Sequence, residues 1–427
     1  MKSWSTPAPP HLPAAAAPRP VRIYDHASDA LLPATDDGRT ARLYVCGITP
    51  YDATHIGHAT TYLTYDLLNR ALIDSGIAVQ YAQNITDIDD PLLERAEQTG
   101  ADWETLAAQQ IDLYRTDMEW LSAIPPEHLV GVTEVIDQIG QAVLELIEGG
   151  FAYRVESADA EEDIYFDVRA ADGALAAWTL GEESRYSLEQ MLRFFAERGG
   201  DPKRPGKRDR LDPLLWRAER QGEPSWQVIG LPVGRPGWHI ECSVIAERCL
   251  GPNFDVQGGG SDLIFPHHEM SSGHATAINE LPLARIYNHV GMVAYRGRKM
   301  SKSLGNLVFV HRLRDAGIEP DVVRTAIFAH HYRSDWEWHD VDVAKAQERL
   351  AEWRSAYQVA MQGSDHRREA DNPVLANLRQ ALSNDLDAPR ALGVLDAWAD
   401  SPEAPELIAD AAQALLGIDL TRKADVA

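Results

Sequence analysis

The stretch VCGITPYDATHIGHATTY, from Val45 to Tyr62, joins a predicted strand to a predicted helix. The apolar run 41–45 is typical of a buried strand, and leucines recur at helical spacing from Leu63 to Leu72. In an open α/β sheet, ligands bind in the crevice at the carboxyl end of such a strand. The free N–H groups and the dipole of the first helical turn favour an anion there. The stretch therefore predicts a site for a charged ligand.

Two histidines of this stretch, His55 and His58, stand at positions i and i+3. Side chains at this spacing lie on one helix face and can reach the same ligand. Between them, Gly57 allows a ligand to approach the backbone closely. An isolated HxxH pattern is more often a surface pair or a helix end than a catalytic pair, so its meaning depends on the rest of the chain.

Composition sets the class of protein. The 427 residues allow two or three domains, and 44% apolar with 25% charged residues is typical of a soluble globular protein. The formal net charge of −25 disfavours binding to nucleic acid. The chain contains no apolar run of about 18 residues, so we expect no membrane span.

The N-terminal 20 residues and the cysteines bear on the cellular compartment of the protein. Residues 1–20 are rich in alanine and proline and lack the pattern of a signal peptide, so we expect an extended arm. Three cysteines do not form a disulfide framework and favour a reducing cytoplasm.

Strands and helices then alternate along the chain. We expect strands at 21–24 and 41–45 to pair across a polar turn, and a further strand at 79–85 to complete the start of a doubly wound nucleotide-binding fold. A hairpin at 151–168 lies in an expected insertion, approximately 125–195. Later expected elements are strands at 254–257 and 286–293 and helices from about 308 onward. The predicted organisation is a sheet domain at 21–310 followed by a helical domain at 311–427.

Two charged loops each have two interpretations. The acidic loop 84–90, which precedes Pro91, either chelates a cation or caps a helix. The basic loop 203–210 is either a solvated face or a contact for a phosphate-bearing ligand.

The loop Lys299-Met300-Ser301-Lys302-Ser303 carries two lysines. Two ammonium groups near a triphosphate can neutralise the charge that develops as pyrophosphate leaves. A single KxxK pattern is usually a solvated loop. Its occurrence together with the upstream His55–His58 tetrapeptide makes phosphate chemistry the better interpretation.

These motifs resemble the two signatures of the class I aminoacyl-tRNA synthetases, and those of the cysteinyl branch in particular. The chain carries, in this order, VCGITPYDATHIGHA, NITDIDD, RPGWHIECS, GGGSDLIFPHHE and GMVAYRGRKMSKSLGN. The segment NDLDAPRALGVLDAWA, 384–399, resembles a later helix of that branch. The resemblance implies a Rossmann-like catalytic domain with an inserted subdomain and a C-terminal helical bundle.

The resemblance also implies a zinc ion held by Cys46, Cys242 and His267. Two thiolates and an imidazole suit Zn²⁺ and leave a fourth position for a substrate thiolate, which binds better than a serine hydroxyl. Considered singly, each cysteine is more simply a small buried apolar residue, and we assign that role to Cys249. Synthetases carry a glutamate ligand where this chain has Ser271, so we expect a three-ligand site.

The C-terminal segment separates two candidate functions. From residue 351 to 427 there are thirteen Asp or Glu and seven Lys or Arg, whereas an RNA-binding surface carries a basic footprint. The shortened, acidic C-terminus resembles the synthetase-derived ligases of mycothiol biosynthesis, which join cysteine to glucosaminyl-inositol. The alternative is a cysteine–tRNA ligase with a reduced C-terminal region.

Residue roles follow from the resemblance. His55, His58, Lys299 and Lys302 would act on the phosphates of ATP, which is expected with Mg²⁺. The cysteinyl-adenylate and adenosine contacts would come from Cys46, Gly47, Ile48, Thr49, Thr61, Asn84, Ile85, Thr86, Trp238, Gly260, Ser261, Asp262 and Val293. The loop ERGGDP, 197–202, is a candidate clamp. We expect a monomer that acts on small molecules, with no nucleic-acid or membrane partner.

Overall fold

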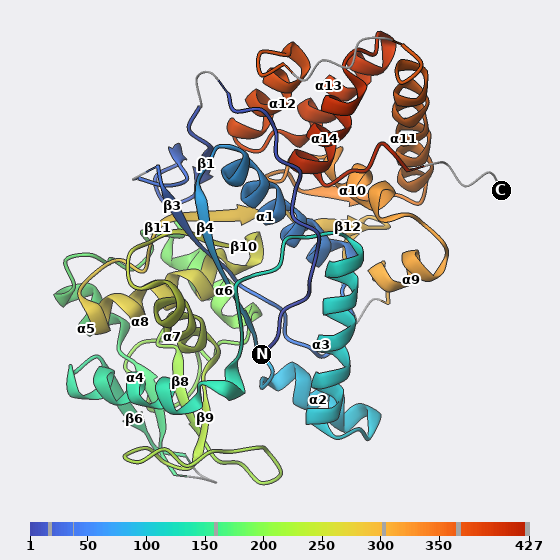
Figure 1. Ribbon diagram of the computed structural model, residues 1–427. Coiled ribbons are helices and arrows are strands. Elements are labelled where there is room, and N and C mark those ends of the chain that lie inside the picture. Colours follow the sequence, from blue (N-terminus) through green and yellow to red (C-terminus); the bar gives the residue numbers. More distant parts are fainter. Residues whose placement is uncertain (16–18, 37, 158–160, 301–304, 364–368, 423–427) are drawn as a thin grey trace.

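Figure 1 shows a computed structural model of the protein. The structure describes residues 1–15, 19–36, 38–157, 161–300, 305–363 and 369–422. The predicted loop residues Ser301, Lys302 and Ser303 lie outside the described residues, and Lys299 is described by its backbone only. Among the described residues, no helix combines the length and the apolar character needed to cross a membrane.

A five-stranded parallel sheet forms the centre of the molecule, in the order β11-β10-β3-β4-β5. Its strands are β3 (Thr40–Val45), β4 (Ala78–Ile85), β5 (His128–Gly131), β10 (Phe254–Gly260) and β11 (Ala284–Val290). The chain leaves β3 through α1 (Ile56–Asp74) to reach β4 on one side, while β10 pairs with β3 on the other side. The strand order therefore reverses at β3, and such a switch point is where open α/β sheets bind ligands.

Helix α1 lies against this sheet because most of its side chains are apolar or buried. Leu63, Leu68 and Leu72 are fully buried, as helical spacing predicted. Gly258 of β10 permits a close approach to α1, since an added Cβ would lie 2.6 Å from Cε1 of Tyr65 and 2.5 Å from its Cζ. The helix is thereby fixed relative to the strand ends that surround the predicted site.

A four-stranded antiparallel sheet is inserted between β5 and β10, in the order β6-β7-β8-β9. Its strands are β6 (Ala152–Val155), β7 (Asp163–Phe166), β8 (Leu214–Ala218) and β9 (Gly234–Pro236). The predicted hairpin corresponds to β6 and β7. The sheet continues to Pro236, whereas the sequence placed the insertion at 125–195. That range also includes β5, which belongs to the parallel sheet.

The first predicted strand pair is wrong. Strand β1 (Arg22–Asp25) pairs with β2 (Ala30–Pro33) as an antiparallel hairpin, whereas the strand at 41–45 joins the parallel sheet. The reason is that the sequence 26–29 makes the turn of this hairpin, so the polar turn near Gly38 only leads into β3. The β1–β2 hairpin then joins β11, through a backbone hydrogen bond from His26 N to Tyr287 O of 2.8 Å.

The remaining helices cover the sheets. Those before the C-terminal region are α2 (Asp90–Thr99), α3 (Trp103–Trp120), α4 (Ile136–Glu148), α5 (Val168–Ala174), α6 (Leu188–Glu197), α7 (Trp238–Leu250) and α8 (Glu269–Asn279). Short helical turns span Val132–Glu134, Ser261–Leu263 and Ile264–His268. Figure 1 shows α7 and α8 on the side of the sheet next to the inserted strands.

The C-terminal region is helical, as predicted. It contains α9 (Val310–Asp315), α10 (Pro320–Phe328), α11 (Val341–Ala360), α12 (Pro373–Ser383), α13 (Ala388–Asp400) and α14 (Pro405–Leu416). A small sheet of β12 (Val293–Tyr295), β13 (Arg298–Lys299) and β14 (Trp336–Trp338) precedes and accompanies it.

A buried ion pair ties this helical region to α1. Arg324 of α10 is fully buried and donates to the Asp66 carboxylate, which also accepts from Arg70 Nε at 2.8 Å. Breaking a buried, hydrogen-bonded pair of this kind strongly destabilises a fold, because it leaves a charge without compensation. The C-terminal helices are therefore packed on the helix that carries the predicted histidines.

Candidate active site

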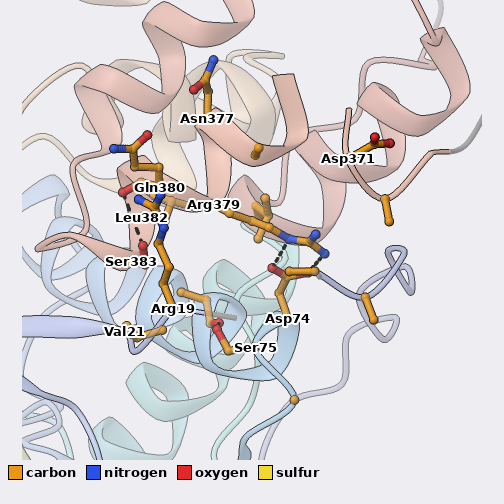
Figure 2. Close-up of a pocket in the computed structure, with 17 residues that line it drawn as sticks. Arg19, Val21, Asp74, Ser75, Asp371, Asn377, Arg379, Gln380, Leu382 and Ser383 are labelled. Carbon is orange, nitrogen blue, oxygen red and sulfur yellow. Dashed lines mark hydrogen bonds and ion pairs between the residues drawn. The ribbon is translucent and has the colours of Figure 1, made fainter. Parts of the chain in front are cut away.

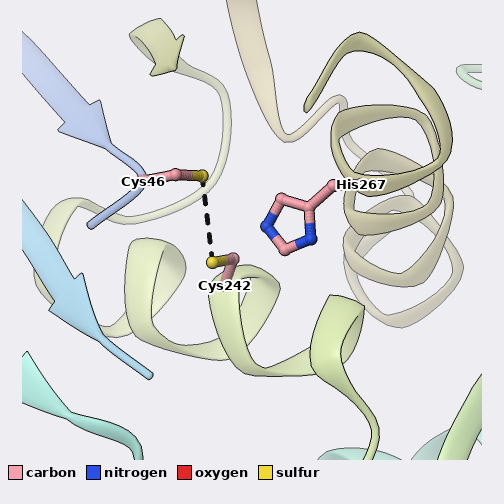
Figure 3. A group of neighbouring side chains, drawn as sticks. All are labelled: Cys46, Cys242 and His267. Atoms are coloured by element: carbon pink, nitrogen blue, oxygen red, sulfur yellow. Dashed lines mark hydrogen bonds between the residues drawn. The ribbon is translucent and has the colours of Figure 1, made fainter. Parts of the chain in front are cut away.

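Three metal-ligand side chains meet at the carboxyl end of β3. Cys46 follows β3, Cys242 lies in α7 and His267 lies in the turn before α8. All three are buried, and one ligand atom from each lies within 4.8 Å of the others. The two Sγ atoms are 3.9 Å apart, and Figure 3 shows the imidazole of His267 facing them. The structure thus brings together the three residues that the motifs suggested.

The spacing of these donors fits a tetrahedral zinc site. With Zn–S bonds of about 2.3 Å, two thiolates at a tetrahedral angle lie about 3.8 Å apart. The observed Sγ–Sγ distance of 3.9 Å matches this value. Two sulfurs and one imidazole are also the soft and borderline donors that Zn²⁺ prefers.

The fourth ligand position is not supplied by Ser271. Its Oγ donates to the backbone carbonyl of His239 at 2.9 Å, and Ser271 is fully buried. The hydroxyl therefore joins α8 to α7 instead of belonging to the donor cluster. Among the described residues, the cluster contains three ligands.

The two thiols have different electrostatic environments. Burial raises the pKa of the Cys46 thiol well above its ordinary value. Burial acts in the same direction on Cys242, but hydrogen bonding with Cys46 and the nearby His267 outweigh it and bring the pKa of Cys242 well below its ordinary value. The thiolate is the form of cysteine that binds a metal, so Cys242 is already poised as a ligand.

Further polar groups surround the cluster. Gln257 Nε2 donates to Cys46 Sγ at 3.3 Å, and His268 Nε2 lies 3.4 Å from the same sulfur. His239 Nδ1 lies 3.0 Å from His267 Nδ1. Groups of this kind orient metal ligands and tune their basicity. The sequence analysis missed Gln257 and His239. The only signal for them was their position, Gln257 just before the glycine run and His239 beside Trp238.

Trp238 is positioned by α7, of which it is the first residue. Its ring stacks on the imidazole of His267, with centroids 4.4 Å apart and an interplanar angle of 29°. The predicted substrate contact of Trp238 therefore lies beside the metal cluster.

The two histidines of the first motif lie at the start of α1. His55 is the N-cap, and its Nδ1 accepts a hydrogen bond of 3.1 Å from Gly57 N–H. The rings of His55 and His58 are stacked, with centroids 3.8 Å apart. Both therefore present their rings at the helix end that favours an anion.

These histidines line a cavity of about 300 Å³. The lining is formed by Thr49, Tyr51, Asp52, Ala53, His55, Gly57, His58, Thr61, Gly260, Asp262, Val290, Gly291, Met292, Val293, Met300 and Leu307. It includes seven predicted residues: Thr49, His55, His58, Thr61, Gly260, Asp262 and Val293. Tyr51, Asp52, Met292, Met300 and Leu307 were not predicted, because they stand in loops without a periodic pattern.

Other predicted contacts form a hydrogen-bonded network between the loop that follows Cys46 and the end of β4. Gly47 N–H donates to Asn84 Oδ1 at 2.9 Å, and Asn84 Nδ2 donates to Thr86 Oγ1 at 3.0 Å. A Cβ on Gly47 would stand 1.7 Å from the backbone oxygen of Asn84, so only glycine fits there. Thr86 N–H donates to Ile48 O at 2.9 Å. Gly47, Ile48, Asn84, Ile85, Thr86 and Ser261 are absent from the described cavity lining.

The candidate clamp at 197–202 reaches the same region. Arg198 Nη1 donates to Asp262 O at 2.6 Å and also to Phe265 O. Arg198 thereby joins the end of α6 to the turn that carries Asp262 and leads to His267. The sequence marked this loop as a candidate clamp without a physical reason. The hydrogen bonds of Arg198 to the turn before His267 supply that reason.

The acidic loop is a helix cap. The Asp89 side chain accepts from Asp90 N–H at 2.8 Å at the start of α2, and Asp87 accepts from Thr133 N–H at 2.9 Å. The described residues of this loop form no metal-ligand group. Burial raises the pKa of Asp89 to about 6.

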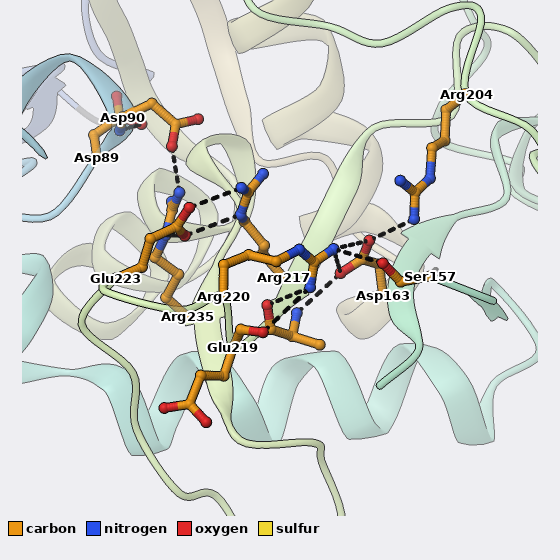
Figure 4. Close-up of polar contacts among 11 residues, drawn as sticks. Asp89, Asp90, Ser157, Asp163, Arg204, Arg217, Glu219, Arg220, Glu223 and Arg235 are labelled. Carbon is orange, nitrogen blue, oxygen red and sulfur yellow. Dashed lines mark hydrogen bonds and ion pairs between the residues drawn. The ribbon is translucent and has the colours of Figure 1, made fainter. Parts of the chain in front are cut away.

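Arginines connect this loop to the inserted sheet, as Figure 4 shows. The buried Arg235 of β9 donates to the Asp90 carboxylate and, through Nε, to Glu223 Oε2 at 3.3 Å. In the same sheet, Asp163 pairs with Arg204 and Arg220, each at 2.8 Å. The basic loop 203–210 is thus engaged in ion pairs within the insertion, at Arg204, Lys207 and Arg208.

The third cysteine, Cys249, was expected to be buried. The structure leaves it half-buried near the end of α7, and all three cysteines are free thiols. Cys249 lies in the last turn of α7, between the exposed Arg248 and the buried Leu250, so only part of its side chain faces the core.

Comparisons with known proteins agree with this geometry. A family model described as the catalytic domain of class I (C) tRNA synthetases matches residues 34–348. In fold, the chain is similar to methionyl-tRNA synthetase from Mycobacterium tuberculosis, with a TM-score of 0.63 and 16% identity over 89% of this chain and 92% of that chain. A leucyl-tRNA synthetase from Agrobacterium radiobacter gives a TM-score of 0.60 and 13% identity over 89% and 83% of the two chains. Fold and site together define a class I aminoacyl-tRNA synthetase catalytic domain.

Curated relatives narrow this class. The chain is 54% identical to the L-cysteine:1D-myo-inositol 2-amino-2-deoxy-alpha-D-glucopyranoside ligase of Micrococcus luteus, over 98% of this chain and 100% of that protein. It is 51% identical to the ligase of the same name from Paenarthrobacter aurescens, over 98% and 100% of the two chains. The chain belongs to this family of ligases.

Proposed function

We propose that the protein joins the carboxyl group of L-cysteine to the amine of glucosaminyl-inositol, with conversion of ATP to AMP and pyrophosphate. The observation that carries the proposal is the 54% identity to a ligase of this name over 98% of the chain and the whole length of the relative. The product amide is an intermediate of mycothiol biosynthesis.

In the first half-reaction, the cysteine carboxylate attacks the α-phosphate of ATP, giving cysteinyl-adenylate and releasing pyrophosphate. His55 and His58 bind the phosphates at the N-terminal end of α1, a role supported by their stacked rings in the cavity wall. Lys299 and Lys302 stabilise the charge that develops as pyrophosphate leaves, while Mg²⁺ accompanies the nucleotide. Asp262 accepts from a ribose hydroxyl and the Val293 backbone flanks the adenine.

Cys46, Cys242 and His267 would hold a zinc ion, as their buried donors within 4.8 Å of one another suggest. A zinc ion bound there would offer an open position to the substrate thiolate, which a serine hydroxyl occupies poorly. Trp238, stacked on His267, covers one side of the cysteine subsite. The hydrogen bonds among Gly47, Asn84 and Thr86 fix the loop that follows Cys46.

In the second half-reaction, the sugar amine attacks the activated carbonyl carbon. A C–N bond forms, the bond between the carbonyl carbon and the phosphate oxygen of AMP breaks, and AMP leaves. The proton of the amine passes to a nearby histidine or to the departing phosphate. The acidic C-terminal segment supports a small acceptor in preference to tRNA. We further propose that the enzyme acts as a monomer. We also propose that it works in the cytoplasm, in keeping with its three free cysteines.

An acceptor competition tests the proposal. The purified protein receives ATP, Mg²⁺ and cysteine, followed by either glucosaminyl-inositol or cysteine-accepting tRNA, and AMP release is measured with the mass of the product. We expect AMP and an amide product with the sugar alone. Aminoacylation of tRNA alone would instead identify a cysteine–tRNA ligase with a reduced C-terminal region.

A further inference from the structure

A second polar cleft lies between the N-terminal arm and the C-terminal helices. Its volume is about 340 Å³. It is lined by Arg19, Pro20, Arg22, Gln380, Ser383, Asn384 and Arg390. These residues come from the end of the arm, the start of β1, the end of α12 and the first turn of α13. We call it the arginine cleft.

The arginine cleft is separate from the catalytic cavity. The two share no lining residue among those described. Helix α1 carries His55 at its beginning, and Ser75 follows its last turn beside a neighbouring cavity. With 19 residues and a rise of about 1.5 Å per residue, α1 spans about 28 Å. A ligand in the arginine cleft would therefore not occupy the nucleotide site.

The lining of the arginine cleft is cationic. It contains three arginines and no carboxylate. None of Arg19, Arg22 and Arg390 forms an ion pair with another residue in the part of the chain that the structure describes. This grouping is unusual in a chain of net charge −25, where acidic side chains are in excess. Like charges gathered around one cleft repel one another, and a bound anion would relieve that repulsion.

Two carboxylates that lie between Asn384 and Arg390 in the chain are engaged elsewhere. Asp387 caps α13 by accepting from the backbone N–H of Arg390 at 3.1 Å. Asp385 accepts from Tyr332 Oη at 2.6 Å and pairs with Arg333 Nη2 at 2.7 Å. Neither carboxylate is part of the cleft lining. Arg22 Nη2 donates to the backbone carbonyl of Leu31 at 2.6 Å, so this guanidinium is partly engaged. The side chains of Arg19 and Arg390 have no such partner among the described residues.

The walls of the cleft are held by backbone contacts. Asp385 N–H donates to Arg22 O at 2.9 Å, so the loop after α12 is joined to β1. Asp385 and Leu386 adopt the left-handed backbone region, with φ of 64° and 49°. Non-glycine residues hold this conformation only where the surroundings fix it. Arg22 and Asn384 are therefore presented by a defined framework.

A neighbouring cavity extends the arginine cleft along α12. This cavity has a volume of about 590 Å³ and shares Arg19, Gln380 and Ser383 with the cleft. Figure 2 shows Arg379 turned to Asp74, with which it forms two hydrogen bonds of 2.8 Å. Arg19 instead extends toward the end of α12, beside Ser383. Arg379 is thus neutralised by Asp74, whereas Arg19 forms no ion pair with the residues that the structure describes.

We propose that the arginine cleft binds the phosphate group of a small molecule. A guanidinium presents a planar fork of N–H donors that matches phosphate oxygens, and the positive charge of three of them attracts a phosphate dianion. The side-chain amides of Gln380 and Asn384 supply neutral donors at the same place, whereas the Ser383 hydroxyl donates to Gln380 O at 3.4 Å. A long nucleic acid would meet an acidic surface beyond these three cations, which favours a compact ligand.

The experiment measures binding of three probes to the full-length, zinc-loaded protein by calorimetry. The probes are inorganic phosphate, pyrophosphate and glucose 6-phosphate, and the catalytic cavity is kept filled by cysteine and an ATP analogue with a non-cleavable α,β linkage. The test variant is R19Q/R390Q, and the control is R95Q, on α2 and away from the cleft. Circular dichroism and retained ligase activity establish that each variant is folded.

We expect one binding site for at least one probe, with an affinity that falls as salt rises. R19Q/R390Q should weaken it by about tenfold or more, since charge-assisted hydrogen bonds of this kind are lost, whereas R95Q should leave it unchanged. Tighter binding of glucose 6-phosphate than of the inorganic ions would identify a phosphomonoester as the natural ligand. Absence of binding by all three probes, or equal binding by the double variant, would overturn the proposal. So would RNA binding that depends on Arg19 and Arg390 without binding of the small phosphates.

Discussion

The Sγ atoms of Cys46 and Cys242 lie 3.9 Å apart, although 196 positions separate the two residues in the chain. One follows a strand of the parallel sheet and the other lies in the helix that begins just after the inserted sheet. Their meeting therefore requires both sheets to be in place. A metal ion bound by this pair would therefore also report correct assembly of the two sheets.

The first prediction concerns Cys242. C242A should lose both bound zinc and cysteine-dependent ATP–pyrophosphate exchange, because two donors remain where Zn²⁺ needs at least three protein ligands in a catalytic site. Metal analysis and the exchange assay measure the two effects. The matched control is C249A, whose thiol is half-buried in the same helix and outside the donor cluster. Full activity with retained zinc in C242A would refute the ligand assignment.

The second prediction concerns His58. H58N should lower the rate of ATP–pyrophosphate exchange by about 10²–10³-fold, since loss of one preorganised donor to a developing anion has an effect of this order. Zinc content should be unchanged, because His58 lies in the nucleotide cavity and not in the metal cluster. His58 is preferred to His55, whose Nδ1 also caps α1. H11N in the exposed arm is the control. An equal loss in H11N, or a loss of zinc in H58N, would contradict the assigned role.

The sequence predicted the site better than its surroundings. Cys46, Cys242 and His267 were found because their motifs are specific, and α1 because its leucines keep helical spacing. Strand β5 was missed, since four residues next to a proline pair carry no alternating pattern long enough to detect. The bridge from Arg235 to Asp90 was also missed. Charged pairs between distant segments leave no local periodicity, so only the folded chain reveals them.

The third prediction concerns Asp163, which is buried and pairs with two arginines in the inserted sheet. D163A should lower the free energy of unfolding by about 2–3 kcal/mol, because it leaves Arg204 and Arg220 without their shared carboxylate. The arginines are partly exposed, which keeps the loss below that of a fully buried pair. Denaturant unfolding measures it.

The neighbouring residue provides the control for Asp163. Glu162 pairs with Arg154 at 3.8 Å, and both side chains are exposed. E162A should change the free energy of unfolding by less than about 0.5 kcal/mol. Equal effects of the two substitutions would show that the arginine pairs of Asp163 do not stabilise the insertion.

The fourth prediction is a pH dependence at Glu247 of α7. Burial, with a smaller contribution from Glu145, raises the pKa of Glu247 from 4.5 to about 7 in the folded protein. Between these values the folded state holds a proton that the unfolded state has released, so unfolding releases a proton and the free energy of unfolding falls as pH rises. Above pH 7 the carboxyl is ionised in the folded protein, and the free-energy cost of burying its charge is fully present. E247Q removes it, and should therefore be more stable than the parent at pH 8 by on the order of 1–3 kcal/mol.

At pH 4.5 and below, the parent carboxyl is protonated in both states, so E247Q and the parent should differ little in stability there. Unfolding by denaturant at pH 8 and at the lowest pH that retains the fold gives both differences. E148Q, at the exposed end of α4, should shift the free energy of unfolding by less than about 0.5 kcal/mol at either pH. If E247Q stabilised the protein equally at both pH values, its effect would come from packing and not from the ionisation of Glu247.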